Sequence, residues 1–131
     1  MQTILIIDDD EETRRVLAEL LNGAGYYVYL AAGGDEGVRL FRSERIEVAL
    51  VDIWMSEKDG LETIMDLRRM VPDAKIIAMT GTVKAGLINP LSWARRLGAK
   101  STLRKPFSAA ELLTAVSDAL SFKGDGRVTI P

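Results

Sequence analysis

The sequence predicts an α/β fold in which a five-stranded parallel sheet is covered by helices on both faces. Short apolar runs alternate five times with segments whose apolar residues recur at helical spacing, which is the pattern of repeated strand–helix units. The run Val48–Val51 is apolar throughout, as expected of a strand buried on both faces. Polar residues follow four of these runs, at the edge where parallel sheets place their ligands.

Local sequence signals mark where the predicted helices start and end. Pro72 ends the third helix, Asn89-Pro90 starts the fourth, and the Ser108-x-x-Glu111 pattern starts the fifth. Right-handed crossovers leave only a few doubly wound topologies. The predicted strands are 3–7, 26–31, 48–51, 74–79 and 101–103, and the predicted helices are 11–23, 34–42, 61–71, 90–98 and 108–120, with a loop at 81–88.

The composition is that of one soluble globular domain. Of the 131 residues, 47% are apolar and 27% are charged, and we expect the domain at 1–122, with 123–131 as a loose tail or the start of a linker. The formal charge of -2 provides no basic surface for nucleic acid. The chain has no Cys and no His, which excludes thiol chemistry and histidine triads. No apolar run approaches the roughly 18–20 residues of a membrane span, so we expect a cytoplasmic protein.

Five polar residues follow four of the predicted strands. They are Asp8 and Asp9, Asp52, Thr80 and Lys105. If the strand order is 2-1-3-4-5, the first and third strands are neighbours, and three carboxylates converge in one cleft. Like charges at such a distance repel by roughly 4 kcal/mol per pair at 4 Å and an effective dielectric of 20, and a hard cation such as Mg²⁺ relieves this repulsion. The Thr hydroxyl and the Lys ammonium would complete a clamp on a phosphoryl group.

These motifs resemble those of response-regulator receiver domains, the phosphoacceptor modules of two-component signalling. The resemblance covers residues 2–122 and implies a flavodoxin-like (βα)5 fold. It rests on four motifs in order, each at a predicted strand end: Asp8-Asp9-Asp10, Asp52-x-x-Met55-x-x-x-Asp59-Gly60, Thr80-Gly81 and Lys105-Pro106-Phe107.

The resemblance implies a role for each site residue. Asp52 would accept a phosphoryl group from the phosphohistidine of a histidine kinase or a histidine phosphotransfer protein. Asp9, Asp52 and the backbone carbonyl of Trp54 would ligate Mg²⁺, or Mn²⁺ in its place, and Asp8 would act through a metal-bound water. The phosphoryl oxygens would be bound by Thr80, the amide of Gly81, and Lys105. Such a protein is a phosphoacceptor that assists its own phosphorylation and dephosphorylation, not an enzyme acting on other substrates.

Four positions bear on signalling and on the lifetime of the phosphorylated form. The family usually has Pro at the position of Ser56 and often an aromatic residue at that of Thr102, so no switch aromatic is present. Trp54 and Thr82 should lie nearest the path of a hydrolytic water, and neither is suited to orient it. We therefore expect a long-lived phosphorylated form. We also expect the output domain or protein partner to be contacted through the 81–105 region, and a phosphorylation-dependent dimer is compatible with this. We expect no direct contact with nucleic acid or membrane.

Other readings of the same residues predict different functions. The three consecutive acids could serve only to cap a helix, although capping needs one acid and not three. A haloacid-dehalogenase phosphatase also uses Asp, Thr, Lys and Mg²⁺, but it needs a second Asp where Trp54 stands. A receiver-like interaction module that works without phosphorylation is the remaining alternative, which the missing switch aromatic favours and the intact acidic residues oppose.

Overall fold

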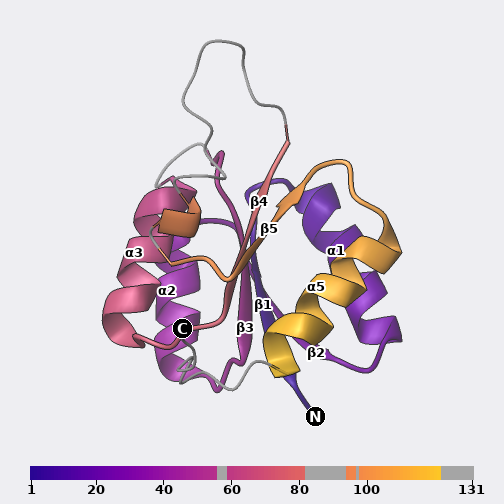
Figure 1. Cartoon of the computed structure of the whole chain (residues 1–131), viewed down its shortest axis with the longest axis horizontal. Coiled ribbons are helices and arrows are strands. Elements are labelled where there is room, and N and C mark those ends of the chain that lie inside the picture. The colour runs from indigo at the N-terminus through magenta and orange to yellow at the C-terminus, as the bar shows by residue number, and fades with distance from the viewer. Residues whose placement is uncertain (56–58, 82–93, 97, 122–131) are drawn as a thin grey trace.

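The computed structural model describes residues 1–55, 59–81, 94–96 and 98–121. Their five strands form one parallel sheet in the order β2-β1-β3-β4-β5, which confirms the predicted topology. Figure 1 shows the sheet edge-on, with α2 and α3 on one side and α1 and α5 on the other. The strands are β1 (Thr3–Ile7), β2 (Tyr27–Ala31), β3 (Val48–Asp52), β4 (Ile76–Thr80) and β5 (Ser101–Arg104), and the helices are α1 (Glu11–Gly23), α2 (Gly34–Ser43), α3 (Gly60–Met70) and α5 (Ala109–Ser121).

Alternate residues of the central strands enter two separate cores. Leu5, Ile7 and Val51 pack on the side of α2 and α3, whereas Ile4 and Leu50 pack on the side of α1 and α5. Because both faces are covered, β3 and β4 are buried at every position, and this is why their sequences are apolar without alternation.

The register brings the carboxyl ends of the strands to one edge. Ile7 pairs with Val51 across β1 and β3, and Asp52 pairs with Met79 across β3 and β4. Thr80 pairs with Arg104 across β4 and β5. The residues that end these strands, or that directly follow them, therefore lie side by side at the carboxyl edge of the sheet.

Several predicted boundaries differ from the observed ones by one or two residues, and three of them have a clear local reason. Tyr26 was predicted in β2, but its amide bonds to the carbonyl of Leu21 at 3.0 Å and closes the turn after α1. Ala74 was predicted in β4, but its amide bonds to Val71 at 2.9 Å. Val71 itself is 41% exposed and extended, since the residue before a proline is disfavoured in a helix, so it does not belong to the buried stripe of α3.

Where the structure describes them, the helices start at the predicted residue or within one residue of it. Asp10 caps α1 through the amide of Thr13, and Asp59 caps α3 through the amide of Glu62 at 2.8 Å. Ser108 and Glu111 form a reciprocal capping box with bonds of 2.8 and 3.0 Å. The predicted loop at 81–88, the helix start at 89–90 and the tail at 123–131 lie mostly or wholly outside the described residues, although 94–96 are helical.

Within the described part of the chain, no helix has the length and apolar character needed to cross a membrane.

Candidate functional site

Three carboxylates converge where β1 and β3 end. Asp52 is the last residue of β3, and Asp8 and Asp9 directly follow β1. One carboxylate oxygen from each of the three lies within 4.8 Å of the others. Asp8 and Asp52 are buried, with 0% and 5% of their surface exposed, whereas Asp9 is exposed. The structure thus brings together the three acids that the sequence predicted at this edge.

Asp8 is held through all of its polar atoms. Its amide continues the β1–β2 ladder by donating to the carbonyl of Ala31 at 3.1 Å. Its two carboxylate oxygens accept from the amide of Asp10 at 3.0 Å and from Lys105 Nζ at 2.8 Å. Its backbone carbonyl accepts from Arg14 Nη1 at 2.7 Å. A buried carboxylate needs such partners, because burying it unpaired would be strongly unfavourable.

Lys105 lies between two of the acids. Its Nζ is 2.8 Å from Asp8 Oδ2 and 3.7 Å from Asp52 Oδ2, so its closer partner is Asp8. Its backbone amide donates to the carbonyl of Thr80 at 2.6 Å, which ties the residue to the end of β4. The peptide bond that follows it, to Pro106, is cis. The side chain is one quarter exposed, so it faces both the site and solvent.

Charge in this cluster is poorly balanced. Burial first, and then the negative charge of Asp8, raise the pKa of Asp52 to about 7, while Lys105 opposes this rise. The amide of Trp54 also lowers the pKa, through a bond of 3.3 Å to Asp52 Oδ1. One ammonium group therefore does not neutralise the acids around it, and a further cation at this position would stabilise the charged form of Asp52.

Thr80 supplies a hydroxyl without a partner. The residue is fully buried at the end of β4, and its Oγ1 makes no hydrogen bond to any residue that the structure describes. Leaving a buried polar group unsatisfied costs about 1–3 kcal/mol. An orphaned hydroxyl beside a carboxylate cluster is therefore suited to a bound group that brings its own oxygens.

Gly60 allows α3 to start against the end of β3. A Cβ atom at this position would overlap the backbone carbonyl oxygen of Asp52 and the Cα of Ile53. Without a side chain, the amide of Gly60 donates to the carbonyl of Ile53 at 3.0 Å. Gly60 belongs to the sequence motif that follows Asp52, and the structure shows that close packing requires Gly at this position.

The other predicted site residues are placed as follows. Gly81 follows Thr80 at the end of β4 and is half-buried, and Thr102 lies half-buried within β5. Trp54 is 49% exposed, and it stands where a haloacid-dehalogenase phosphatase would need its second Asp. Ser56 and Thr82 lie outside the described residues. Sequence reasoning missed Arg14. The feature that could have drawn attention to it is a positively charged residue close to the start of a helix whose first charged residues are acidic.

Comparisons with known proteins identify the family. The model of the "Response regulator receiver domain" family matches residues 4–117. Response regulator receiver protein CpdR of Brucella abortus is 36% identical over 120 residues, which cover 92% of this chain and 98% of that protein. The crystal structure of a CheY-like receiver domain protein from Methanospirillum hungatei JF-1 aligns with a TM-score of 0.86 at 26% identity, covering 97% and 98% of the two chains.

Some relatives are longer proteins. Transcriptional regulatory protein GlrR of Escherichia coli is 31% identical over 117 residues, which make up 89% of this chain but 26% of GlrR. The chain thus spans about a quarter of the length of that regulator. The match over 4–117 and the shared topology both agree with the resemblance found in the sequence motifs. The chain therefore belongs to the response-regulator receiver domains of two-component signalling.

Proposed function

We propose that Asp52 accepts a phosphoryl group from the phosphohistidine of a histidine kinase or a histidine phosphotransfer protein. The observation that carries this proposal is the buried carboxylate of Asp52, which shares the edge of the sheet with two further acids and lies 3.7 Å from Lys105 Nζ. A carboxylate oxygen forms a bond to phosphorus while the bond from phosphorus to the imidazole nitrogen breaks. The imidazole leaves with that electron pair and takes up a proton, and an acyl phosphate remains on Asp52.

The acidic cluster fits a hard divalent cation. Its donors are carboxylate oxygens within 4.8 Å of one another, a set that suits Mg²⁺, with Mn²⁺ as the alternative. Asp9, Asp52 and the backbone carbonyl of Trp54 would hold the cation directly, and Asp8 would hold it through a water. When bound, the cation supplies positive charge that offsets the charge of the transferring phosphoryl group.

Lys105 and Thr80 would bind the phosphoryl oxygens. Lys105 Nζ already lies between Asp8 and Asp52, so a small displacement away from Asp8 brings it to an oxygen on Asp52. The unpartnered, buried hydroxyl of Thr80 can donate to a second oxygen, and the amide of Gly81 can donate to a third. These residues assist the phosphorylation of their own protein, and the protein is not an enzyme acting on other substrates.

Signalling would follow from the same contacts. Thr80 directly precedes residues 81–105, and Lys105 is the last of them. A movement of these two side chains toward a phosphoryl group would therefore favour one of two conformations of that region. We place the contact with an output domain or protein partner there, and a phosphorylation-dependent dimer is compatible with this placement. The receiver domain would comprise residues 1–122, with 123–131 as a tail or linker, and would work in the cytoplasm.

Mass spectrometry after incubation with acetyl phosphate and Mg²⁺ tests the proposal. The wild-type protein should gain the mass of one phosphoryl group, and EDTA should prevent the gain. Asp52→Asn should remain unlabelled, because the amide keeps the shape but is no nucleophile. Asp35→Asn, which changes an exposed carboxylate on α2, is the matched control and should be labelled normally.

Two results would contradict the proposal. Stoichiometric labelling of Asp52→Asn would show that another residue is the acceptor. A wild-type protein that resists labelling by acetyl phosphate and by phosphohistidine donors would instead favour an interaction module that works without phosphorylation, in line with Thr102 at the position of the switch aromatic.

A further inference from the structure

Arg14 is bonded to the backbone of the acidic pair. Its Nη1 donates to the carbonyl oxygen of Asp8 at 2.7 Å, and this contact is partly buried. Asp8 and Asp9 are joined by the peptide bond to which this carbonyl belongs. Arg14 therefore contacts the segment that carries both acids without occupying either carboxylate oxygen of Asp8, which accept from Asp10 and Lys105.

The position of Arg14 runs against the usual charge preference of a helix. The N-terminus of a helix carries partial positive charge and disfavours cations. The N-cap residue Asp10 and the first-turn residues Glu11 and Glu12 follow this rule, and Arg14 does not. Departures from local rules in folded proteins concentrate at functional positions, and here the departure brings a planar donor to the backbone of Asp8.

We infer that Arg14 is a positioning residue, which fixes the peptide between Asp8 and Asp9 and so sets the affinity of the acidic cluster for its cation. This inference rests on the proposed function. Groups that orient metal ligands without touching the metal typically change metal affinity 10–100-fold when they are removed.

Arg14 and Lys105 hold Asp8 in different ways. Lys105 bonds to the carboxylate and, on the proposed function, leaves it for the phosphoryl group. The bond from Arg14 goes to the main chain, so it persists when Lys105 moves. Asp8 then remains oriented by Arg14 and by the amide of Asp10 in both states of the site.

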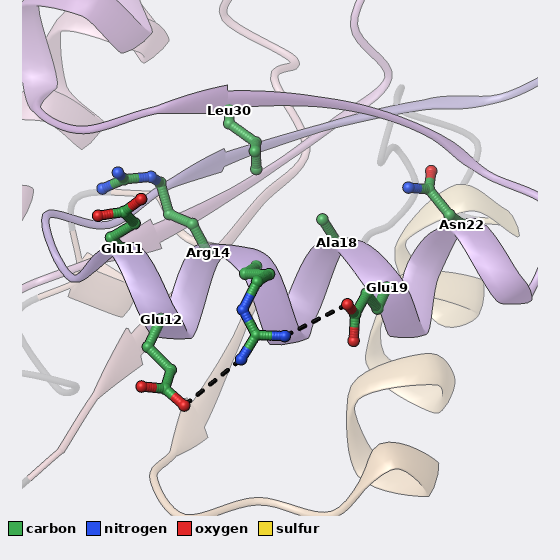
Figure 2. A pocket seen from close by; sticks show the side chains of 8 residues that line it. Glu11, Glu12, Arg14, Ala18, Glu19, Asn22 and Leu30 are labelled. Carbon is green, nitrogen blue, oxygen red and sulfur yellow. Dashed lines mark hydrogen bonds and ion pairs between the residues drawn. The ribbon is translucent and has the colours of Figure 1, made fainter.

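The neighbouring residue Arg15 provides a matched control. It lies on the same helix and pairs with Glu12 at 3.4 Å and with Glu19 at 3.3 Å, all three side chains being exposed. Figure 2 shows Arg14 beside Glu11 at the N-terminal end of α1, whereas the dashed ion pairs of Glu12 and Glu19 lie on another side of the helix. Removing Arg15 removes the same charge from α1 but leaves the contact with Asp8 intact.

Isothermal titration with MgCl₂ on the full chain tests the inference through the sign of the effect. If Arg14 acted only through its charge, Arg14→Ala would bind Mg²⁺ more tightly, because a repelling cation is lost. If it positions the acidic pair, Arg14→Ala should bind Mg²⁺ roughly 10-fold or more weakly, and Arg15→Ala should bind it as the wild type does. Equal or tighter binding by Arg14→Ala would overturn the inference.

Conservative variants cover the case in which Arg14→Ala does not fold. Arg14→Lys keeps the charge but loses the planar guanidinium, and it should bind Mg²⁺ more weakly than Arg15→Lys and more tightly than any folded Arg14→Ala. Equal affinities of Arg14→Lys and Arg15→Lys, together with an Arg14→Ala that fails to fold, would assign Arg14 to stability alone and overturn the inference.

A second measurement needs no metal. Amide exchange of Asp10, whose N–H donates to Asp8 Oδ1, should be faster in Arg14→Ala than in Arg15→Ala. Unchanged exchange would contradict the positioning role. A wild-type protein that binds no Mg²⁺ and takes no label would overturn the proposed function and this inference together, whereas normal wild-type binding with unaffected Arg14 variants would overturn this inference alone.

Discussion

Replacing Asp52 by Asn removes a carboxyl group whose charged form is disfavoured by the metal-free fold. Burial and the charge of Asp8 raise the pKa of Asp52 from 3.8 to about 7, against the opposing effect of Lys105. In the unfolded chain the group ionises near its ordinary pKa. Between these two values the folded state keeps a proton that the unfolded state releases, so the stability of the metal-free protein falls as pH rises through this window.

The size of the effect follows from the two pKa values. A rise from 3.8 to about 7, at about 1.4 kcal/mol per pH unit, corresponds to at most about 4 kcal/mol. Asn has no proton to lose. Metal-free Asp52→Asn should therefore be more stable than the wild type by up to this amount at pH 8, and the difference should disappear toward pH 4.

Urea unfolding in EDTA, at several pH values between 4 and 8, measures this difference directly. Asp35→Asn, on the exposed surface of α2, controls for the general loss of a carboxylate. Adding Mg²⁺ should narrow the gap between Asp52→Asn and the wild type, because the cation stabilises the charged carboxylate. A stability difference that is independent of pH, or a mutant that is less stable than the wild type at pH 8, would refute the reasoning.

Three further predictions concern other parts of the structure. Gly60→Ala should destabilise the fold by about 1–3 kcal/mol in urea unfolding, because the new Cβ meets backbone atoms that cannot move aside, whereas Gly23→Ala, with open space around it, should not. The amide and hydroxyl of Thr3 donate hydrogen bonds to the Glu47 carboxylate at 2.6 and 2.7 Å, and the one from the amide chiefly holds the pKa of Glu47 below its ordinary value. The stability that the charged Glu47 contributes to the fold should therefore be present above about pH 4.5 and lost in acid. Glu47→Gln should lack this pH dependence. Trp54→Asn should lose its acyl phosphate up to about 10²-fold faster than the wild type, since an amide can orient water and the half-exposed indole cannot; equal decay rates would show that Trp54 is no shield.

The sequence was sufficient for the fold because every strand carries its own signal. The uninterrupted apolar runs of β3 and β4 indicate burial on both faces, and the polar residues at the ends of four strands indicate the edge that carries the candidate site. Strand starts were harder to place. Tyr26 and Ala74 have the composition of strand residues, yet their amides bond backwards to Leu21 and Val71, which depends on how the preceding helix ends.

The site was predictable in its membership and not in its contacts. Asp8, Asp9, Asp52 and Lys105 could be placed together because parallel strands align their carboxyl ends. Lys105 lies nearer to Asp8 than to Asp52 because of the path that the chain takes after β5. The spacing of apolar residues in the sequence does not predict that path. The bond from Arg14 to the carbonyl of Asp8 is likewise a contact that no periodicity reports.

These contacts together explain how one lysine can serve two partners. Asp8 is buried and needs a donor for each of its oxygens, so a site in which Lys105 were its only support would resist losing that lysine. The backbone carbonyl of Asp8 is instead held by Arg14 and one carboxylate oxygen by Asp10. On the proposed function, a movement of Lys105 toward a phosphoryl group on Asp52 would leave a single oxygen of Asp8 to be satisfied by a metal-bound water. Because the bonds from Arg14 and Asp10 do not involve the lysine, Asp8 and Asp9 would keep their positions while Lys105 moves. Under the proposed function, a phosphoryl group on Asp52 would then act on residues 81–105 and not on the metal site itself.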